Sequence, residues 1–164
     1  MFCRHWITSL GLLTVLTAVA VANPPYKALI VDGQNGHDWK STSPVLTQLL
    51  EETALFTVDV ATSPPRRQDM SGFNPSFSAY DVVVSNYQGD EWPEETKKAF
   101  VEYVKGGGGV VIYHFACAAF PKWKEYNEII GLGGWGRRNQ EWGPYVRWRD
   151  GKVVREPAPE SKRT

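Results

Sequence analysis

Four short apolar runs, separated by helical or turn-rich stretches, limit the possible folds of this chain more than any other feature. Residues 27–33, 81–87 and 109–114 are apolar through their centres, which is the pattern of strands covered on both faces. Residues 55–62 form a further strand-like run. A sheet covered on both faces needs helices on both sides of it. The alternation therefore predicts an α/β fold with a doubly wound, mostly parallel sheet and helices on both faces.

The first helix is predicted after the polar loop that follows residues 27–33. Apolar side chains recur at helical spacing within residues 41–53 and supply one stripe that can be buried. Ser43 precedes Pro44, and a serine N-cap followed by proline at the first helical position is a common helix start. We therefore expect this helix to begin at Pro44.

Three further elements are predicted along the rest of the chain. A second helix is expected to start at Pro93, with acidic residues in its first turn, and to stop at the glycines that begin with Gly106. Another helix is expected around Pro121, which must break or begin it. Two alternating runs flank residues 150–151, an Asp-Gly pair that is a strong hairpin signal.

The amino-terminal segment reads as a secretory signal peptide. A basic residue, Arg4, precedes an uncharged apolar stretch that ends in a small-x-small pattern at residues 20–22. The alternative is a retained membrane anchor, but the apolar stretch is shorter than the roughly 20 residues a spanning helix needs. We expect residues 1–22 to be the signal peptide, residues 23–157 to be one domain and residues 158–164 to be a polar tail. The mature protein would then be secreted or periplasmic, and would meet the membrane only through the signal peptide before its cleavage.

Cysteine and charge counts narrow the function classes. Cleavage would remove Cys3 and leave Cys117 as the one thiol, so no internal disulfide is expected. The chain has 18 basic and 18 acidic side chains, so no basic field would recruit nucleic acid. Nothing in the sequence calls for a cofactor, and the chain is compatible with a homo-oligomer.

Polar loops follow three of the predicted strands. They read GQNGHDW after the first strand, NYQGDEW after the third and HFACAAF after the fourth. In open α/β sheets, ligands bind beyond the carboxyl ends of the strands. We therefore expect these loops to line one shared crevice.

Two histidines in these loops are the candidate catalytic residues. His37 and His114 are predicted to face the same crevice, where imidazole can act as a general acid or base. The alternatives are that His37 caps the following helix or bonds to its own loop, and that His114 is a histidine satisfied at a strand end. A metal site is not predicted, because three or more ligands are needed and no close spacing of His, Cys and acidic residues supplies them. The candidate substrate-binding residues are Asn35, Asp38, Trp39, Asn86, Asp90, Trp92, Trp135 and Arg137.

Two other features allow a functional and a structural interpretation. Tryptophan rings can stack on sugars, or they can pack in the core and at the rims of clefts. Cys117 would be a thiolate nucleophile if it were exposed near a helix N-terminus, but it lacks the flanking glycines of a nucleophile elbow, which favours a small buried residue. The glycine-rich residues 131–138 lack the ending of a phosphate-binding loop and are predicted to carry Trp135, Arg137 and Arg138 across the pocket mouth.

Several motifs together resemble a known family. The segments ALIVDGQNGHDW, SPVLTQLLEETALFTVDV, YDVVVSNYQGDEWPEETKKAFVEYVKGGGGVVIYH and AFPKWKEYNEIIGLGGWGRR are similar to the trehalose-utilisation (ThuA-like) family, from about Lys27 to Pro144. The resemblance implies a fold like that of class I glutamine amidotransferases, a flavodoxin-like layered sheet, and a role in carbohydrate use. Family domains usually continue through further strands, so the chain is expected to be the N-terminal portion of such a domain. Glutaminase activity is not expected, because its later His and Glu are missing.

Three functions are compatible with these observations. The first is an exported enzyme, or enzyme-like protein, that acts on a sugar such as trehalose or a keto-sugar by lyase, isomerase or hydrolase chemistry. The second is a sugar-binding module without turnover, in which the aromatic and amide side chains matter and the histidines do not. The third is a truncated remnant without a site of its own.

Overall fold

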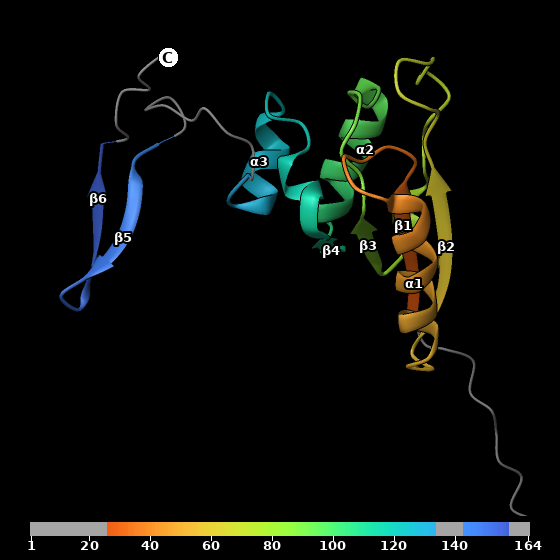
Figure 1. The fold of residues 1–164 in the computed structure, drawn as a ribbon, viewed down its shortest axis with the longest axis horizontal. Coiled ribbons are helices and arrows are strands. Elements are labelled where there is room, and N and C mark those ends of the chain that lie inside the picture. Colours follow the sequence, from red (N-terminus) through yellow and green to blue (C-terminus); the bar gives the residue numbers. More distant parts are fainter. Residues whose placement is uncertain (1–25, 134–142, 158–164) are drawn as a thin grey trace, which may run out of the picture.

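The computed structural model describes residues 26–133 and 143–157 (Figure 1). The predicted signal peptide and polar tail, and the candidate residues Trp135 and Arg137, lie outside these residues. Within them, no helix is long and apolar enough to cross a membrane. The elements, with η for a 3-10 helix, are β1 (Tyr26–Asp32), α1 (Trp39–Glu51), β2 (Phe56–Thr62), η1 (Phe77–Ala79), β3 (Val82–Ser85), α2 (Glu94–Lys105), β4 (Gly109–Ile112), η2 (His114–Ala118), α3 (Lys124–Ile130), β5 (Tyr145–Arg149) and β6 (Lys152–Glu156).

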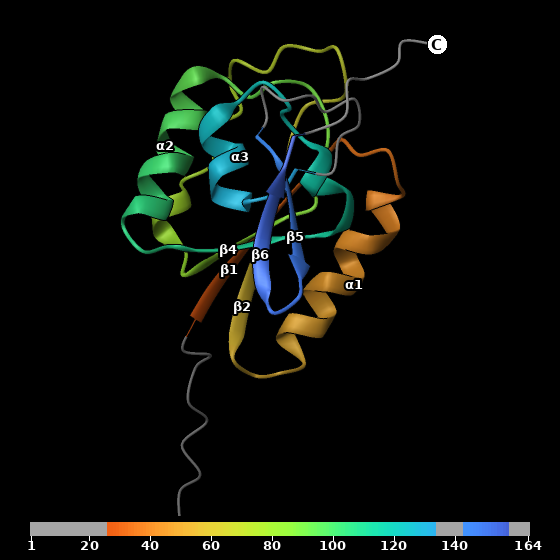
Figure 2. The same ribbon diagram turned by 90° about the vertical axis from the view of Figure 1, so that its left-hand side faces the viewer.

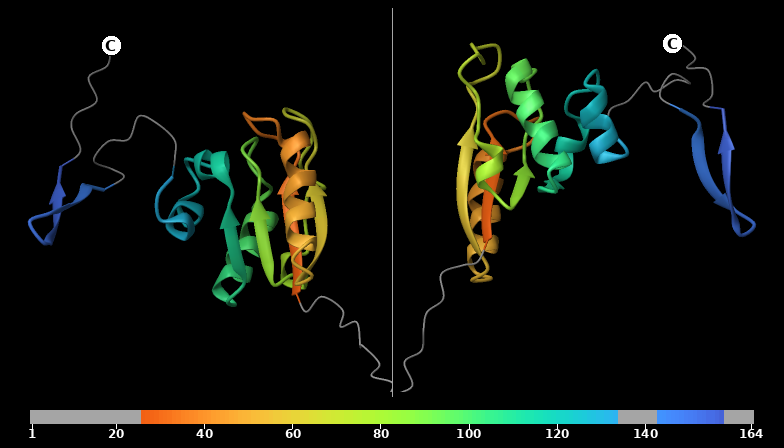
Figure 3. Two further views of the ribbon diagram at one scale, coloured as in Figure 1. Left: turned by 60° about the horizontal axis from the view of Figure 1, so that its bottom comes forward. Right: turned by 180° about the vertical axis from the view of Figure 1, so that it is seen from behind.

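The first four strands form one parallel sheet. Its order is β2-β1-β3-β4, so β1 and β3 are central and the other two strands lie at the edges. Each neighbouring pair is parallel, and the strands run in one direction in the left view of Figure 3. The predicted α/β fold with a doubly wound parallel sheet is confirmed. The carboxyl ends of all four strands consequently meet at one edge of the sheet.

Helices cover the sheet on both faces. Figure 2 shows α1 on one side of the strands and α2 and α3 on the other. Alternate residues of β1 point to opposite faces, and both sets are buried: Leu29 and Val31 join the cluster that contains α2, while Ala28 and Ile30 lie on the side of α1. This two-sided burial explains why β1 is apolar without alternation.

An aromatic cluster forms the core on the α2 side. Trp92 lies within it, 2% exposed, with its ring 5.0 Å from that of Phe120 and 5.7 Å from that of Phe100, measured between centroids. Further rings come from η1 and α3, including Phe77 and Tyr126. Edge-to-face pairs of this kind stabilise a core by about 0.5–1.5 kcal/mol each beyond the burial of their area.

The start of α1 differs from the prediction. The helix begins at Trp39, and Asp38 is its N-cap, with a carboxylate that accepts a hydrogen bond from the backbone N–H of Ser41 at 3.2 Å. Pro44 therefore lies inside the helix rather than at its first position. The predicted start at Pro44 was wrong, because Asp38 caps the helix five residues before Ser43. Pro44 is the sixth helical residue, and it cannot donate the helical hydrogen bond to the carbonyl of Lys40.

The predictions for α2, for the segment around Pro121 and for the hairpin agree with the structure. α2 begins directly after Pro93, carries Glu94 in its first turn and ends at the glycines from Gly106. The segment around Pro121 is divided, as the proline requires, into η2 before it and α3 after it. β5 and β6 form the expected antiparallel hairpin, whose turn at residues 150–151 has positive φ at both positions.

Candidate active site at the carboxyl edge of the sheet

Loops from β1, β3 and β4 supply the candidate residues at one edge of the sheet. The register pairs Val31 at the end of β1 with Ser85 at the end of β3, and Ser85 with Ile112 at the end of β4. The backbone N–H of Asn86 continues this pairing by donating to the carbonyl of Val31 at 2.9 Å. The three predicted loops therefore leave the sheet side by side.

The two candidate catalytic histidines are neighbours. The ring of His37 lies 4.6 Å from the ring of His114, centroid to centroid, at an interplanar angle of 57°. Phe115 packs edge-on against His37 at 4.8 Å. Both histidines are exposed to solvent. Two proton-carrying side chains from loops 77 residues apart in the chain thus form one accessible pair.

His114 has a strained backbone. Its φ is +45°, in the left-handed region that costs a non-glycine residue about 1–2 kcal/mol. The residue stands at the turn from β4 into η2, where a nucleophile elbow would place its reactive side chain. Cys117 lies half-buried within η2, three residues later. The strained position at this strand end therefore presents an imidazole and not the thiol.

A pair of asparagines ties the histidine loop to the sheet. The side-chain amide of Asn35 donates to the side-chain and backbone oxygens of Asn86, both at 3.2 Å. The side-chain oxygen of Asn35 accepts the backbone N–H of His37 at 2.9 Å. Asn86 in turn donates to Thr42 at 3.0 Å and to Ser43 at 3.1 Å, both on α1. Asn86 is 2% exposed, so its place is to hold the loop and the helix together rather than to contact a ligand.

The two candidate carboxylates are already engaged by the protein. Asp38 accepts from the hydroxyl of Ser41 at 2.6 Å and from its backbone N–H, and these bonds lower the pKa of the carboxyl below its usual value. The carboxylate of Asp90 accepts the backbone N–H of Arg67. The backbone N–H of Asp90 donates to the side chain of Gln34 at 2.8 Å. Asp38 is therefore a charged acceptor at neutral pH, and Asp90 fixes the loop after β3 against the loop after β2.

The two described candidate tryptophans lie in different environments. Trp92 is covered by core rings, so neither face of its indole is available to a sugar in this structure. Its indole N–H has no hydrogen-bond partner within the described part of the chain. Trp39 is only half-buried and stands at the start of α1, beside the Asn35 loop. Of the described tryptophans proposed to stack on a sugar, Trp39 alone offers its ring.

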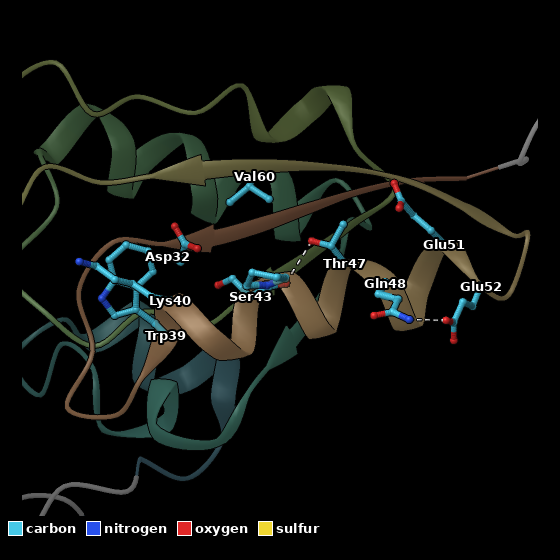
Figure 4. A pocket seen from close by; sticks show the side chains of 10 residues that line it. Asp32, Trp39, Lys40, Ser43, Thr47, Gln48, Glu51, Glu52 and Val60 are labelled. Carbon is cyan, nitrogen blue, oxygen red and sulfur yellow. Dashed lines mark hydrogen bonds between the residues drawn. The ribbon is translucent and has the colours of Figure 1, made fainter.

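Two hollows border this edge. A pocket of about 470 Å³ lies where the loops after β1 and β2 meet, and Trp39 and Lys40 form one of its walls. An open groove of about 790 Å³ runs between α1 and β2 from Trp39 down to Glu52 (Figure 4). The groove is largely apolar, with Val60 in its wall, and it reaches the carboxyl edge only where Asp32 and Trp39 stand. The smaller pocket is the one at the strand ends.

Sequence reasoning missed three residues that shape this edge. Gln34 is buried, donates to the carbonyl of Pro64 at 2.8 Å and joins the loops after β1, β2 and β3 through its amide. Lys40 and Arg66 border the smaller pocket. Position alone could have suggested all three, because each lies in or directly beside a loop that follows a strand.

No group of three or more His, Cys, Asp or Glu side chains within residues 26–133 and 143–157 is arranged to hold a metal ion. The arrangement offers instead two adjacent imidazoles, an amide bonded to the backbone of His37 and an indole at the edge of a pocket. These groups can exchange protons and can bind hydroxyls and an apolar ring face.

Comparison with known proteins identifies the family. The sequence model described as ThuA, trehalose utilisation, matches residues 27–159. The chain belongs to the ThuA family. No curated protein matches it.

Two solved structures extend this ThuA assignment. A ThuA-like protein from Parabacteroides merdae ATCC 43184 is 54% identical, with a TM-score of 0.75, over 80% of this chain and 47% of that one. A ThuA-like protein from Bacteroides uniformis ATCC 8492 is 21% identical, with a TM-score of 0.51, over 72% of this chain and 48% of that one, and it shows a similar fold only. The ThuA chain described here therefore spans about half the length of both proteins.

Proposed function

We propose that this ThuA-family chain serves carbohydrate utilisation by acting on a sugar held at the carboxyl edge of its sheet. His37 and His114 would exchange protons with the sugar, and Asn35 and Trp39 would hold it. The observation that carries this proposal is the contact between the two imidazoles, 4.6 Å apart and both exposed. A trehalose-derived sugar or a keto-sugar is the substrate class, in agreement with the description of the family.

The chemistry follows from the type and spacing of the groups. Imidazole is the side chain that gives and takes protons near neutral pH. Two such rings in contact can serve neighbouring positions of one sugar, one as general base and the other as general acid, as a lyase, isomerase or hydrolase would require. The backbone hydrogen bond from His37 to Asn35 limits how far the first ring can move.

The proposed site of action is outside the cytoplasm. The N-terminal pattern of a basic residue, an apolar stretch and small residues at 20–22 supports export. N-terminal sequencing of the protein recovered from a secreting host should then give a chain that begins at Asn23. A recovered chain that still begins at Met1 would contradict export by cleavage.

Replacement of His114 tests the catalytic proposal most economically. Asparagine tolerates a positive φ, so His114→Asn keeps the turn while removing the imidazole. Turnover of trehalose and its keto derivatives should fall by at least about 100-fold, the usual contribution of a general acid or base, while sugar affinity changes little. Asn74→Ala is the control, because Asn74 is exposed and lines a different hollow, which also includes Tyr103 of α2.

The results separate the competing functions. Unchanged turnover in His114→Asn would contradict a catalytic role for this histidine. Sugar binding by the wild-type protein without any turnover would favour a sugar-binding module. If the wild-type protein neither binds nor turns over any sugar tested, neutral or acidic, the proposed function as a whole would be contradicted.

A further inference from the structure

The pocket at the ends of β1 and β2 is bordered by two cationic side chains from separate elements. Lys40 comes from the first turn of α1, and Arg66 comes from the loop after β2. The remaining wall includes Asn35, Trp39 and Ser63, and none of the residues that line the pocket is acidic. The pocket therefore combines positive charge with hydrogen-bonding groups and an aromatic ring.

The guanidinium of Arg66 is held in place. One of its terminal nitrogens donates to the backbone carbonyl of Gln88 at 2.9 Å. A guanidinium has five N–H donors, so this single bond leaves most of its fork for a ligand. An arginine fixed by a backbone carbonyl is preorganised to bind a planar or tetrahedral anion with two parallel hydrogen bonds.

The ammonium of Lys40 lies 5.7 Å from the centre of the Trp39 ring. The ammonium and the indole thus stand together in the lining of the pocket, to which the loop after β2 contributes Arg66. The carboxylates close to this pocket have partners of their own: Asp38 accepts from Ser41, and Asp32 accepts from the hydroxyl of Thr62 at 2.7 Å. A hydroxyl donor does not remove the charge of a carboxylate, and the charge of Asp38 interacts with that of Lys40. Among the described residues, however, neither Lys40 nor Arg66 forms a salt bridge.

The floor of the pocket is closely packed. Gly33 has a φ of +109°, and a Cβ built on it would lie 2.5–2.6 Å from backbone and side-chain atoms of Ser63. The loops after β1 and β2 therefore touch at this point, with a backbone N–H of Ser63 donating to the carbonyl of Asp32 at 2.9 Å. A pocket with such a fixed floor loses little conformational entropy when it binds a ligand.

Asn35 joins this pocket to the histidine pair. It lines the pocket, and its side-chain oxygen accepts the backbone N–H of His37. Neither histidine lines the pocket, so Asn35 is the residue that joins the pocket to the loop of His37. Pockets for small molecules typically measure 300–1,000 Å³, and about 470 Å³ lies within that range.

We propose that this pocket binds an anionic group of the substrate, a carboxylate or a phosphate, so that the sugar on which the protein acts is an acidic carbohydrate. This inference rests on the proposed function and names its substrate class. Lys40 and Arg66 hold the anion, Trp39 contacts the sugar ring, and the opposite end of the sugar reaches His37 and His114.

Calorimetric titration of the full chain tests the inference. The probes are glucuronate, glucose 6-phosphate, neutral glucose and inorganic phosphate. At low ionic strength at least one of the two acidic sugars should bind tighter than glucose, and which of them does so identifies a carboxylate or a phosphate as the preferred group. Lys40→Met and Arg66→Met should each weaken the preferred acidic sugar about tenfold and leave glucose unchanged. Lys27→Met, an exposed lysine at the opposite end of β1, is the control and should change nothing.

The possible results distinguish this inference from the proposed function. Equal affinity for acidic and neutral sugars, or acidic-sugar affinity unaffected by both Lys40→Met and Arg66→Met, would overturn the inference and leave the proposed function intact. Absence of binding by all four probes would overturn the inference, and with no turnover of any sugar the proposed function would fall as well. Binding of phosphate that both variants abolish would support the cationic pocket even where no sugar binds.

Discussion

Replacement of Asn86 by alanine should destabilise the protein and loosen the histidine loop together. The side chain is 2% exposed and joins Asn35, Thr42 and Ser43 by hydrogen bonds of 3.0–3.2 Å. It is therefore the link between the loop that carries His37 and the first turns of α1. Alanine has neither a donor nor an acceptor in its side chain, so Asn86→Ala removes all of these bonds.

The expected loss follows from the partners that remain. Three side-chain hydrogen bonds at about 1 kcal/mol each give about 3 kcal/mol. Ser43 is buried and would be left without its donor, so the loss of its hydrogen bond should cost more free energy than the loss of the other two. Asn35 and Thr42 are half-buried and can bind water instead. About 3 kcal/mol is a large part of the 5–15 kcal/mol that stabilises a typical domain.

Urea denaturation followed by tryptophan fluorescence measures this loss. The midpoint should fall while the slope of unfolding free energy against urea stays the same. Asn74→Ala is the control, and as an exposed substitution it should stay within about 0.5 kcal/mol of wild type. A loss below about 1 kcal/mol for Asn86→Ala would refute the reasoning, because it would mean that the buried amide network contributes nothing net.

Two further predictions concern the backbone and the pH dependence of stability. Gly33→Ala should lower the free energy of unfolding by at least about 2 kcal/mol, since its φ is +109° and the added Cβ would overlap Ser63; a near-neutral effect in thermal unfolding would contradict this close contact. Burial raises the pKa of the hydroxyls of Tyr87 and Tyr126. The pKa of each hydroxyl is therefore higher in the folded protein than the value of about 10 in the unfolded chain. The stability that each neutral tyrosine contributes is complete below about pH 10. Above about pH 10 it is lost by about 1.4 kcal/mol per pH unit for each tyrosine. Urea denaturation of Tyr87→Phe should show a shallower alkaline decline than the wild type, and an identical decline would contradict the assignment.

The sheet and the meeting of its loops could be predicted because they depend on simple periodicity. Uninterrupted apolar runs indicate strands buried on both faces, and such strands are parallel in α/β folds. Parallel strands bring their following loops to one edge, so His37 and His114 were expected at the same crevice. The topology predicts only this shared edge. The ring contact itself depends on the conformations of the two loops, because β3 lies between β1 and β4.

The start of α1 could not be predicted because two residues compete for the cap. Asp38 and Ser43 are both good N-cap residues, and Pro44 favours the second choice. The tertiary structure decides between them: the earlier start places Thr42 and Ser43 on a helical turn where both can accept from Asn86. A local pattern does not contain that contact.

The burial of Trp92 and Gln34 could not be predicted from the sequence either. Trp92 is flanked by Glu91 and Pro93, which suggests a surface, yet its ring fills the core between α2 and η1. Gln34 is polar and sits in a glycine-rich loop, yet it is buried because two other loops satisfy its amide. In both positions the partners come from segments far away in the chain.

The contact between the two imidazoles is the central claim, and an NMR measurement tests it most directly. The chain has three histidines, of which His5 precedes the described residues, so few ring signals need assignment. A nuclear Overhauser cross-peak is expected between ring protons of His37 and His114, with the His37–Phe115 contact at 4.8 Å as the internal reference. A spectrum that shows the His37–Phe115 cross-peak but none between the two histidines would contradict the shared site.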